Sequence, residues 1–160
     1  MTELKQTIKD WILKRIEITG KDHGVSTDEI QRMEQKHNIT FPLAYKDFLQ
    51  LTGKYFAPLA GIGGHRFEYL EVMQSNARKN LKEYGLAHLM PKNWWVVAEW
   101  DGSEVIWYID LDAGDDPPVY GFNIVEYAYE PSDEWFGKEA DSFSDWINMV
   151  IEEYNEKNQL

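Results

Sequence analysis

The sequence WWVVAEWDGSEVIWYIDL, residues 94–111, holds two runs of aromatic and β-branched residues on either side of an Asp-Gly pair. Such runs favour β-strands, and Asp-Gly between them is a strong signal for a hairpin. Successive side chains of a strand point to opposite faces, and the second run alternates cleanly. We therefore predict antiparallel strands over 94–100 and 104–111. In the second strand the two faces are Val105, Trp107, Ile109, Leu111 and Glu104, Ile106, Tyr108, Asp110.

The strand pattern continues beyond this hairpin and then gives way to a helix. Residues 112–118 are rich in Asp, Gly and Pro, which predicts a turn. Residues 119–129 form a third β run, in which Gly121 favours a bulge. Ser142 is the expected N-cap of a closing helix. The apolar stripe of that helix is Phe143, Trp146, Ile147, Val150, Ile151 and Tyr154.

Upstream of the hairpin the apolar spacing is helical. A first helix carries Leu4, Ile8, Trp11, Ile12 and Ile16 and stops at Gly20. Ser26 and Glu29 have the spacing of a capping box, which opens a second helix through Glu34. Pro42 disfavours helix at the residue before it and is well placed to start a third helix, which Gly53 closes.

The segment between these helices and the hairpin is less regular. Residues 54–65 contain three glycines and read as a loop, and a short strand is expected at 66–70. Apolar residues from Met73 to Tyr84 share one helical face, and Gly85 ends that helix. The separation of helices from strands predicts an α+β fold, an antiparallel β-meander flanked by N-terminal helices and a C-terminal helix. The length of 160 residues predicts a single domain over 1–160.

Charge is distributed unevenly. The net charge is −12; residues 1–98 carry 14 Lys and Arg against 11 Asp and Glu, whereas residues 99–160 carry 2 against 17. The second segment, at −15, repels nucleic acid and anionic membranes and attracts basic protein surfaces. A solvated acidic face that keeps the protein soluble is the simpler interpretation.

No motif in the sequence predicts catalysis or cofactor binding. The chain has no Cys, and its four His residues lack the spacing of a zinc site. Gly61–Gly64 lacks the phosphate-loop pattern, Asp110–Asp116 lacks the order of a calcium loop, and no Gly-x-Ser-x-Gly elbow occurs. We therefore expect no catalytic residue, metal or cofactor. The absence of a long apolar run or a signal-like start predicts a cytoplasmic protein.

Three motifs in order carry a resemblance to a known family. The first motif is the pattern IxxMExxHxIxFPxxYxxFLxxTG over residues 30–53. The second is the strand–turn–strand pattern that ends at Pro118-Val119, and the third is the helix start at 142–147. Together, in this order, they resemble the SUKH superfamily, the Smi/Knr-like proteins. Phe41 stands where that pattern has Leu, and Thr52 where it has Asn. The resemblance covers about residues 26–151 and implies the α+β fold described above.

The resemblance also implies a function. Bacterial members neutralise toxin domains, often nucleases, whereas fungal members resemble regulators that act as interaction scaffolds; no catalytic residue is associated with the motifs. We expect a bacterial immunity protein, monomeric or weakly dimeric, whose partner is a basic toxin domain. The candidate contact residues, with Trp100 and Tyr108 as anchors, are Trp100, Asp101, Glu104, Tyr108, Asp110, Asp112, Asp115, Asp116, Glu126 and Glu130.

Two alternatives remain open at this stage. One is a regulatory scaffold that binds a host protein without any toxin. The other is a carbohydrate or small-ligand module that uses the aromatic strands, in which Trp94, Trp95, Trp100, Trp107 and Tyr108 stack on sugar rings.

Overall fold

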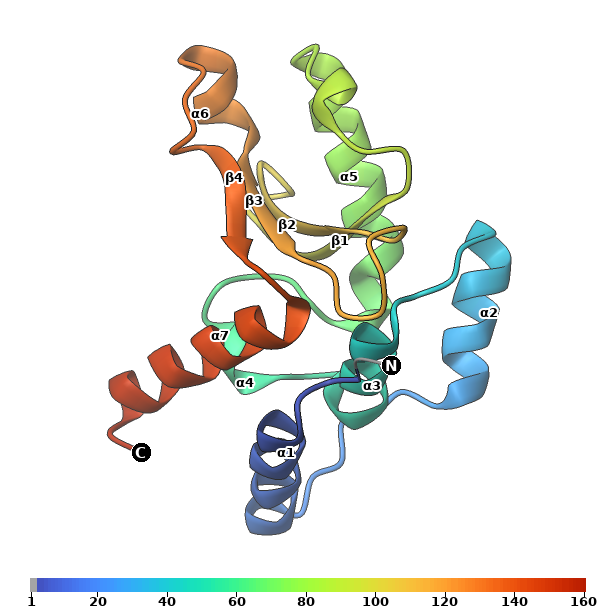
Figure 1. The fold of residues 1–160 in the computed structure, drawn as a ribbon, viewed down its shortest axis with the longest axis vertical. Coiled ribbons are helices and arrows are strands. Elements are labelled where there is room, and N and C mark those ends of the chain that lie inside the picture. The colour runs from blue at the N-terminus through green and yellow to red at the C-terminus, as the bar shows by residue number, and fades with distance from the viewer. Residues whose placement is uncertain (1–2) are drawn as a thin grey trace.

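A computed structural model describes residues 3–160 and contains a four-stranded antiparallel sheet (Figure 1). The strands are β1 (Trp94–Trp100), β2 (Val105–Asp110), β3 (Val119–Asn123) and β4 (Phe136–Ala140). They lie in the order β1-β2-β3-β4, so each strand pairs with the next one along the chain. The predicted α+β class and antiparallel meander are confirmed.

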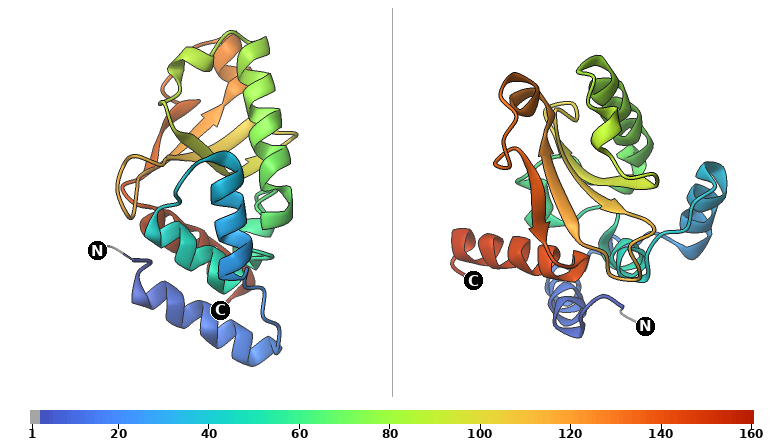
Figure 2. Two further views of the ribbon diagram at one scale, coloured as in Figure 1. Left: turned by 90° about the vertical axis from the view of Figure 1, so that its right-hand side faces the viewer. Right: turned by 45° about the horizontal axis from the view of Figure 1, so that its top comes forward.

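Helices precede, interrupt and close this sheet (Figures 1 and 2). The elements before the sheet are α1 (Gln6–Thr19), α2 (Thr27–His37), α3 (Leu43–Thr52), α4 (Ala57–Ala60), the 3-10 turn η1 (Phe67–Tyr69), α5 (Leu70–Glu83) and the 3-10 turn η2 (Ala87–Leu89). The other two are α6 (Ile124–Tyr129) and α7 (Phe143–Asn158). The predicted capping box at Ser26 and Glu29 is present, and Ser142 caps α7 by accepting from the Asp145 amide.

Two strand predictions are wrong. Residues 67–70 of the predicted strand 66–70 form η1 and the start of α5, because Leu70 lies one turn before Met73 on the same buried helical face. The third β run ends at Asn123 rather than at Tyr129. There the Asn123 side chain caps α6 by accepting from the Glu126 amide, and the Ile124 amide donates to the Glu104 carbonyl at 2.8 Å.

Helix α4 and strand β4 are also absent from the elements predicted from the sequence. Residues 54–65, expected as a loop, contain the short helix α4 with Pro58 in its first turn. Strand β4, FGKEA, was not predicted, because it has a glycine and two adjacent charged residues in place of an apolar alternation. Its pairing with β3 decides its conformation.

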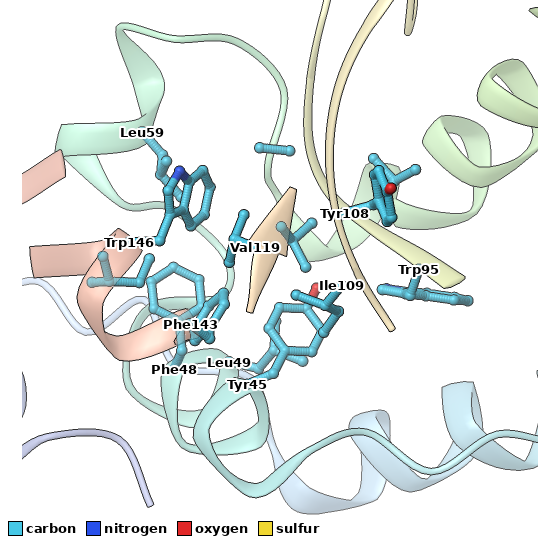
Figure 3. Packing of buried hydrophobic residues seen from close by; sticks show 14 of the residues in the cluster. Tyr45, Phe48, Leu49, Leu59, Trp95, Tyr108, Ile109, Val119, Phe143 and Trp146 are labelled. Carbon is cyan, nitrogen blue, oxygen red and sulfur yellow. The ribbon is translucent and has the colours of Figure 1, made fainter. Parts of the chain in front are cut away.

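The two faces of the sheet are covered differently. Helix α5 lies along one face, and α3 and α7 pack against part of the opposite face (Figures 1 and 2). Figure 3 shows Ile109 and Val119 of the sheet beside Tyr45 of α3 and Phe143 of α7. Within that core the Tyr45 and Phe143 ring centroids are 5.4 Å apart, and Trp95 lies 5.1 Å from Phe41.

The motif glutamate Glu34 connects α2 to α3. Its Oε1 accepts from the Phe41 amide at 2.7 Å and pairs with Lys46 Nζ at 3.0 Å, with only 14% of the side chain exposed. Charge-assisted hydrogen bonds of this kind are stronger than neutral ones. The carboxylate therefore fixes the bend that directs Phe41 and Tyr45 into the core.

The glycine loop lies against the edge of β1. Gly64 and Glu99 exchange two backbone hydrogen bonds, each 2.8 Å long. A Cβ at Gly63 would collide with the Glu99 carbonyl, so the close approach of the two backbones requires glycine there. The glycine loop therefore pairs with a strand edge.

A buried glutamine holds β1 against α5. The Gln74 side chain, in a residue 4% exposed, donates from Nε2 to the Val96 carbonyl and accepts from the Val96 amide at Oε1, both at 2.8 Å. The register of β1 against β2 shifts just after Val96. The amide of Gln74 thus satisfies both backbone groups of a residue beside a bulge, where the strand ladder is disturbed.

We expect Gln74→Leu to destabilise the protein by about 2–4 kcal/mol, because both Val96 backbone groups would be buried without a partner. Urea unfolding would measure this change. Gln35→Leu, at an exposed position of α2, is the matched control and should change stability by less than about 0.5 kcal/mol. Equal stability of the two variants would contradict the role given to Gln74.

His65 is the buried histidine of the fold. It is 3% exposed, and its Nε2 accepts from the Phe56 amide at 2.9 Å, which requires the neutral ring. Burial lowers the pKa of His65 from 6.5 to about 4. The unfolded chain therefore binds a proton between these two values that the folded chain does not.

The free energy of unfolding should consequently fall as the pH drops from 6.5 to about 4 and then lose its dependence on this group. Between pH 7.5 and pH 5 the loss from His65 is about 2 kcal/mol. His65→Gln keeps a hydrogen-bond acceptor but does not titrate, so its unfolding in urea at the two pH values should lack this contribution. The same pH dependence in both proteins would show that His65 is not the group responsible.

Candidate functional site

The predicted contact residues fall into two groups at opposite ends of β2. Trp100, Asp101 and Glu104 lie at the β1–β2 hairpin. The Glu104 carbonyl contacts the start of α6, which contains Glu126 and ends just before Glu130. Asp110, Asp112, Asp115 and Asp116 lie in or next to the β2–β3 turn. Six residues of strand separate the groups by about 20 Å. The structure therefore does not bring all the predicted acids into one patch.

The β2–β3 turn uses its acidic residues to hold the fold together. Asp116 Oδ1 accepts from the Ser144 amide at 2.9 Å, at the start of α7, where a negative charge is favourable. The Asp115 carbonyl accepts from the Ala44 amide of α3 at 2.9 Å. Asp112 accepts from the Asn93 side chain, and Asp110 accepts from the Asp112 amide. These contacts give the turn group a structural role.

The structure corrects one of the two predicted anchors. Tyr108 is 3% exposed, and its ring stacks on Tyr120 with the centroids 5.4 Å apart. Burial raises the pKa of its hydroxyl, and the side chain is not accessible as a surface anchor. Trp100, by contrast, is 58% exposed.

The register shows which residues share the face with Trp100. Directly paired residues of antiparallel strands place their side chains on the same face. One row joins Trp100, Val105 and Asn123, and the next joins Ala98, Trp107, Gly121 and Gly137. The third row, with Ile109 and Val119, lies under α3 and α7. Helix α7 thus covers one half of this face and leaves the other half open.

The open half of this face contains a groove of about 280 Å³. We call it the sheet groove. Trp107 and the two glycines, Gly121 and Gly137, contribute to its lining from the sheet, and residues 133–135 contribute from the segment before β4. In Figure 1 this segment and β4 run between α6 and α7. The lining is Val105, Trp107, Gly121, Phe122, Asn123, Asp133, Glu134, Trp135, Gly137, Lys138 and Glu139.

Glycine at position 121 makes room for an acidic side chain. A Cβ on Gly121 would collide with Oε1 of Glu139, so this carboxylate reaches from β4 across β3. The carboxylate of Glu139 is therefore held above the strands, next to the row that contains Trp107.

The charge of the sheet groove is uncompensated on its acidic side. Within residues 3–160, Asp133, Glu134 and Glu139 form no ion pair with Lys, Arg or His. Lys138 also lines the groove, but its Nζ pairs with Asp141 at 2.6 Å. Three carboxylates beside the half-buried Trp107 and Trp135 favour a cationic protein surface.

The groove residues Asp133, Glu134, Trp135 and Glu139 are not among the contact residues predicted from the sequence, and Trp107 is predicted only as part of a sugar-stacking platform. Residues 130–140 have no periodic pattern, so nothing in the sequence placed them beside β2. The available signal is the large excess of acidic residues over residues 99–160. Asp133, Glu134 and Glu139 are three of those acids.

A second hollow, of about 340 Å³, lies between α1 and the residues around α4 and has the opposite charge. Arg15, Lys21 and His23 line it together with aromatic residues. Arg15 lies 5.8 Å from the centroid of Trp11, one of those aromatic residues. Basic side chains at this hollow make it unsuited to the basic partner expected from the sequence.

The structure offers no group of three metal-ligating side chains anywhere in residues 3–160. Across the same range, none of the helices combines the length and the apolar character that crossing a bilayer requires.

A comparison with protein families finds a match over most of the chain. A family model described as SMI1 / KNR4 family (SUKH-1) matches residues 24–149, which begin just before α2 and end within α7. The match includes the whole sheet and the sheet groove, and α1 lies outside it. No curated protein matches the sequence.

Proposed function

The chain belongs to the SMI1/KNR4 family (SUKH-1), and from this we propose that it is a non-catalytic immunity protein. In this proposal it binds a toxin domain, a nuclease with a basic surface, and neutralises it by covering the active site or a neighbouring surface. The observation that carries the proposal is the sheet groove on an open sheet face, where Trp107 and Trp135 lie near Asp133, Glu134 and Glu139, which form no ion pair within residues 3–160.

The electrostatics support a basic partner. Residues 99–160 have a net charge of −15, and the two lysines among them, Lys138 and Lys157, are both paired with carboxylates of their own chain. A nuclease must present positive charge to the phosphates of its substrate. An acidic face therefore competes for the same surface and accelerates the encounter of the two proteins.

The aromatic residues support a specific contact rather than charge alone. Tryptophan is enriched at the residues that dominate binding energy in protein interfaces. Trp100 is 58% exposed, and the register puts it on the same face as Trp107, one row away. We therefore extend the proposed surface from the groove to Trp100, Asp101, Glu104, Glu126 and Glu130, and leave out Tyr108 and the β2–β3 turn.

Two other functions use the same face. A regulatory scaffold would bind a host protein there, and a carbohydrate module would stack sugar rings on Trp100 and Trp107. The tryptophans on the open face are the observation that favours the carbohydrate alternative. Quenching of tryptophan emission by one member of a glycan panel would support it, and an unchanged spectrum would count against it.

The test is affinity capture of the tagged protein from its source cells at about 50 mM and 300 mM salt, followed by purification of the captured protein. We expect a basic nuclease whose activity the purified chain inhibits, with association at least about tenfold slower at the higher salt because charges are screened. An on-rate that does not change with salt would remove the electrostatic part of the proposal.

A charge-reversal pair locates the surface. Glu134→Lys with Glu139→Lys should weaken binding by at least about tenfold. The matched control, Glu152→Lys with Glu156→Lys, changes the same net charge on the exposed side of α7 and should have a much smaller effect. Equal losses in both pairs would show that net charge, and not the sheet groove, governs binding.

A further inference from the structure

We propose that the sheet groove receives an arginine side chain of the partner, with the guanidinium against the Trp107 ring and in an ion pair with Glu139. This inference rests on the proposed function and deepens it, because it names the chemical group that the site recognises.

The lining leaves an indole ring accessible. Gly121 and Gly137 are paired with each other in the row of Trp107, and neither has a side chain to cover that ring. Trp107 is half-buried, and its centroid lies 6.5 Å from that of Trp146 on α7, so the helix supports one side of the ring. A flat, supported aromatic surface suits a planar cation.

The carboxylates are held in place by ordered backbone. The Trp135 amide donates to the Ser132 carbonyl at 3.1 Å, and the Asn123 amide donates to the Trp135 carbonyl at 2.7 Å. The Glu134 amide also donates to Ser132 Oγ at 3.2 Å. Asp133 and Glu134 therefore stand on a turn anchored to the end of β3, and Glu139 approaches from β4. A guanidinium has five N–H donors with which to reach several carboxylate oxygens at once.

The chain already uses arginine in this way inside its own fold. Three of its four arginines lie over aromatic rings: Arg78 at 4.4 Å from the Trp94 centroid, Arg66 at 5.3 Å from Tyr55, and Arg15 at 5.8 Å from Trp11. Trp107 has no such cation over it within the described range, 3–160. Because three arginines are engaged within the chain, a second copy of this protein is a poor source for the one that fills the groove.

Other occupants fit less well. Asp133, Glu134 and Glu139 repel phosphate and carboxylate groups. Lysine carries the same charge, but its compact ammonium cannot stack flat on an indole or bond two carboxylates through a planar fork. A volume of about 280 Å³ accommodates one long side chain rather than a folded segment.

The experiment uses the whole protein and the tripeptide acetyl-Gly-Arg-Gly-amide as the probe. Tryptophan indole N–H resonances are followed by NMR during titration, with the Trp107 and Trp135 signals assigned from Trp→Phe variants. We expect these two signals to shift saturably, with a dissociation constant on the order of millimolar. The citrulline tripeptide, which has nearly the same shape without the charge, should leave them unchanged, and the lysine tripeptide should bind at least about threefold more weakly.

A conservative variant tests the ion pair. Glu139→Gln should weaken the arginine tripeptide at least about threefold, whereas Glu152→Gln, at an exposed position of α7, should not. Absence of a saturable shift, or equal shifts with citrulline or lysine, would overturn the inference. The titration needs no toxin. Tripeptide binding without capture of a nuclease would therefore contradict the proposed immunity function and support the arginine site. Capture of a nuclease without tripeptide binding would support the immunity function and contradict the arginine site.

Discussion

The register of the four-stranded sheet is the constraint on which the rest of the structure depends. A shift of one residue between two strands would exchange the faces of every side chain on one of them. Such a slip in β2 would place Trp107 under α5 and Tyr108 on the open face. The hairpin that joins β1 to β2 opposes it, because Asp101, Gly102 and Ser103 all have positive φ there. Separately, the Gln74 amide bound to Val96 fixes β1 against α5. In that hairpin Glu99 accepts from the Ser103 amide at 2.7 Å, which fixes the turn.

Much of the fold could be predicted because local patterns and tertiary packing agree. The Asp-Gly pair, the alternation of β2 and the apolar stripe of α7 each identify their element. Prediction failed where the local sequence pattern and the tertiary packing disagree. The sequence IVEYAY has residues suited to a strand, yet the Asn123 cap and the contact with the Glu104 carbonyl make it helical. Strand β4 has no pattern of its own, and only the pairing with β3 makes it extended.

The candidate site was less predictable than the fold, because the sequence positions of acidic residues do not show which of them lie together in space. Glu104 and Asp116 are equivalent in a count of acids, but Asp116 binds the start of α7, whereas Glu104 lies near α6. Alternation correctly put Tyr108 opposite Trp107, but it did not show that α5 covers the face of Tyr108. The residues that carry the family motif, such as Glu34 and Tyr45, are core and bend residues. They determine the scaffold, and the open half of the sheet face is a separate feature.

The bridge between Gly64 and Glu99 has a consequence for the behaviour of the protein at high concentration. An unpaired strand edge is a template on which further chains can add, and proteins protect such edges against uncontrolled polymerisation. The glycine loop occupies part of the outer edge of β1, which is otherwise apolar and buried along most of its length. At the other edge, β4 is short and places Lys138 and Glu139 side by side, which discourages a second sheet from docking. The two edges thus use different means, a covering loop and exposed charge, to keep a tryptophan-rich sheet from forming fibres.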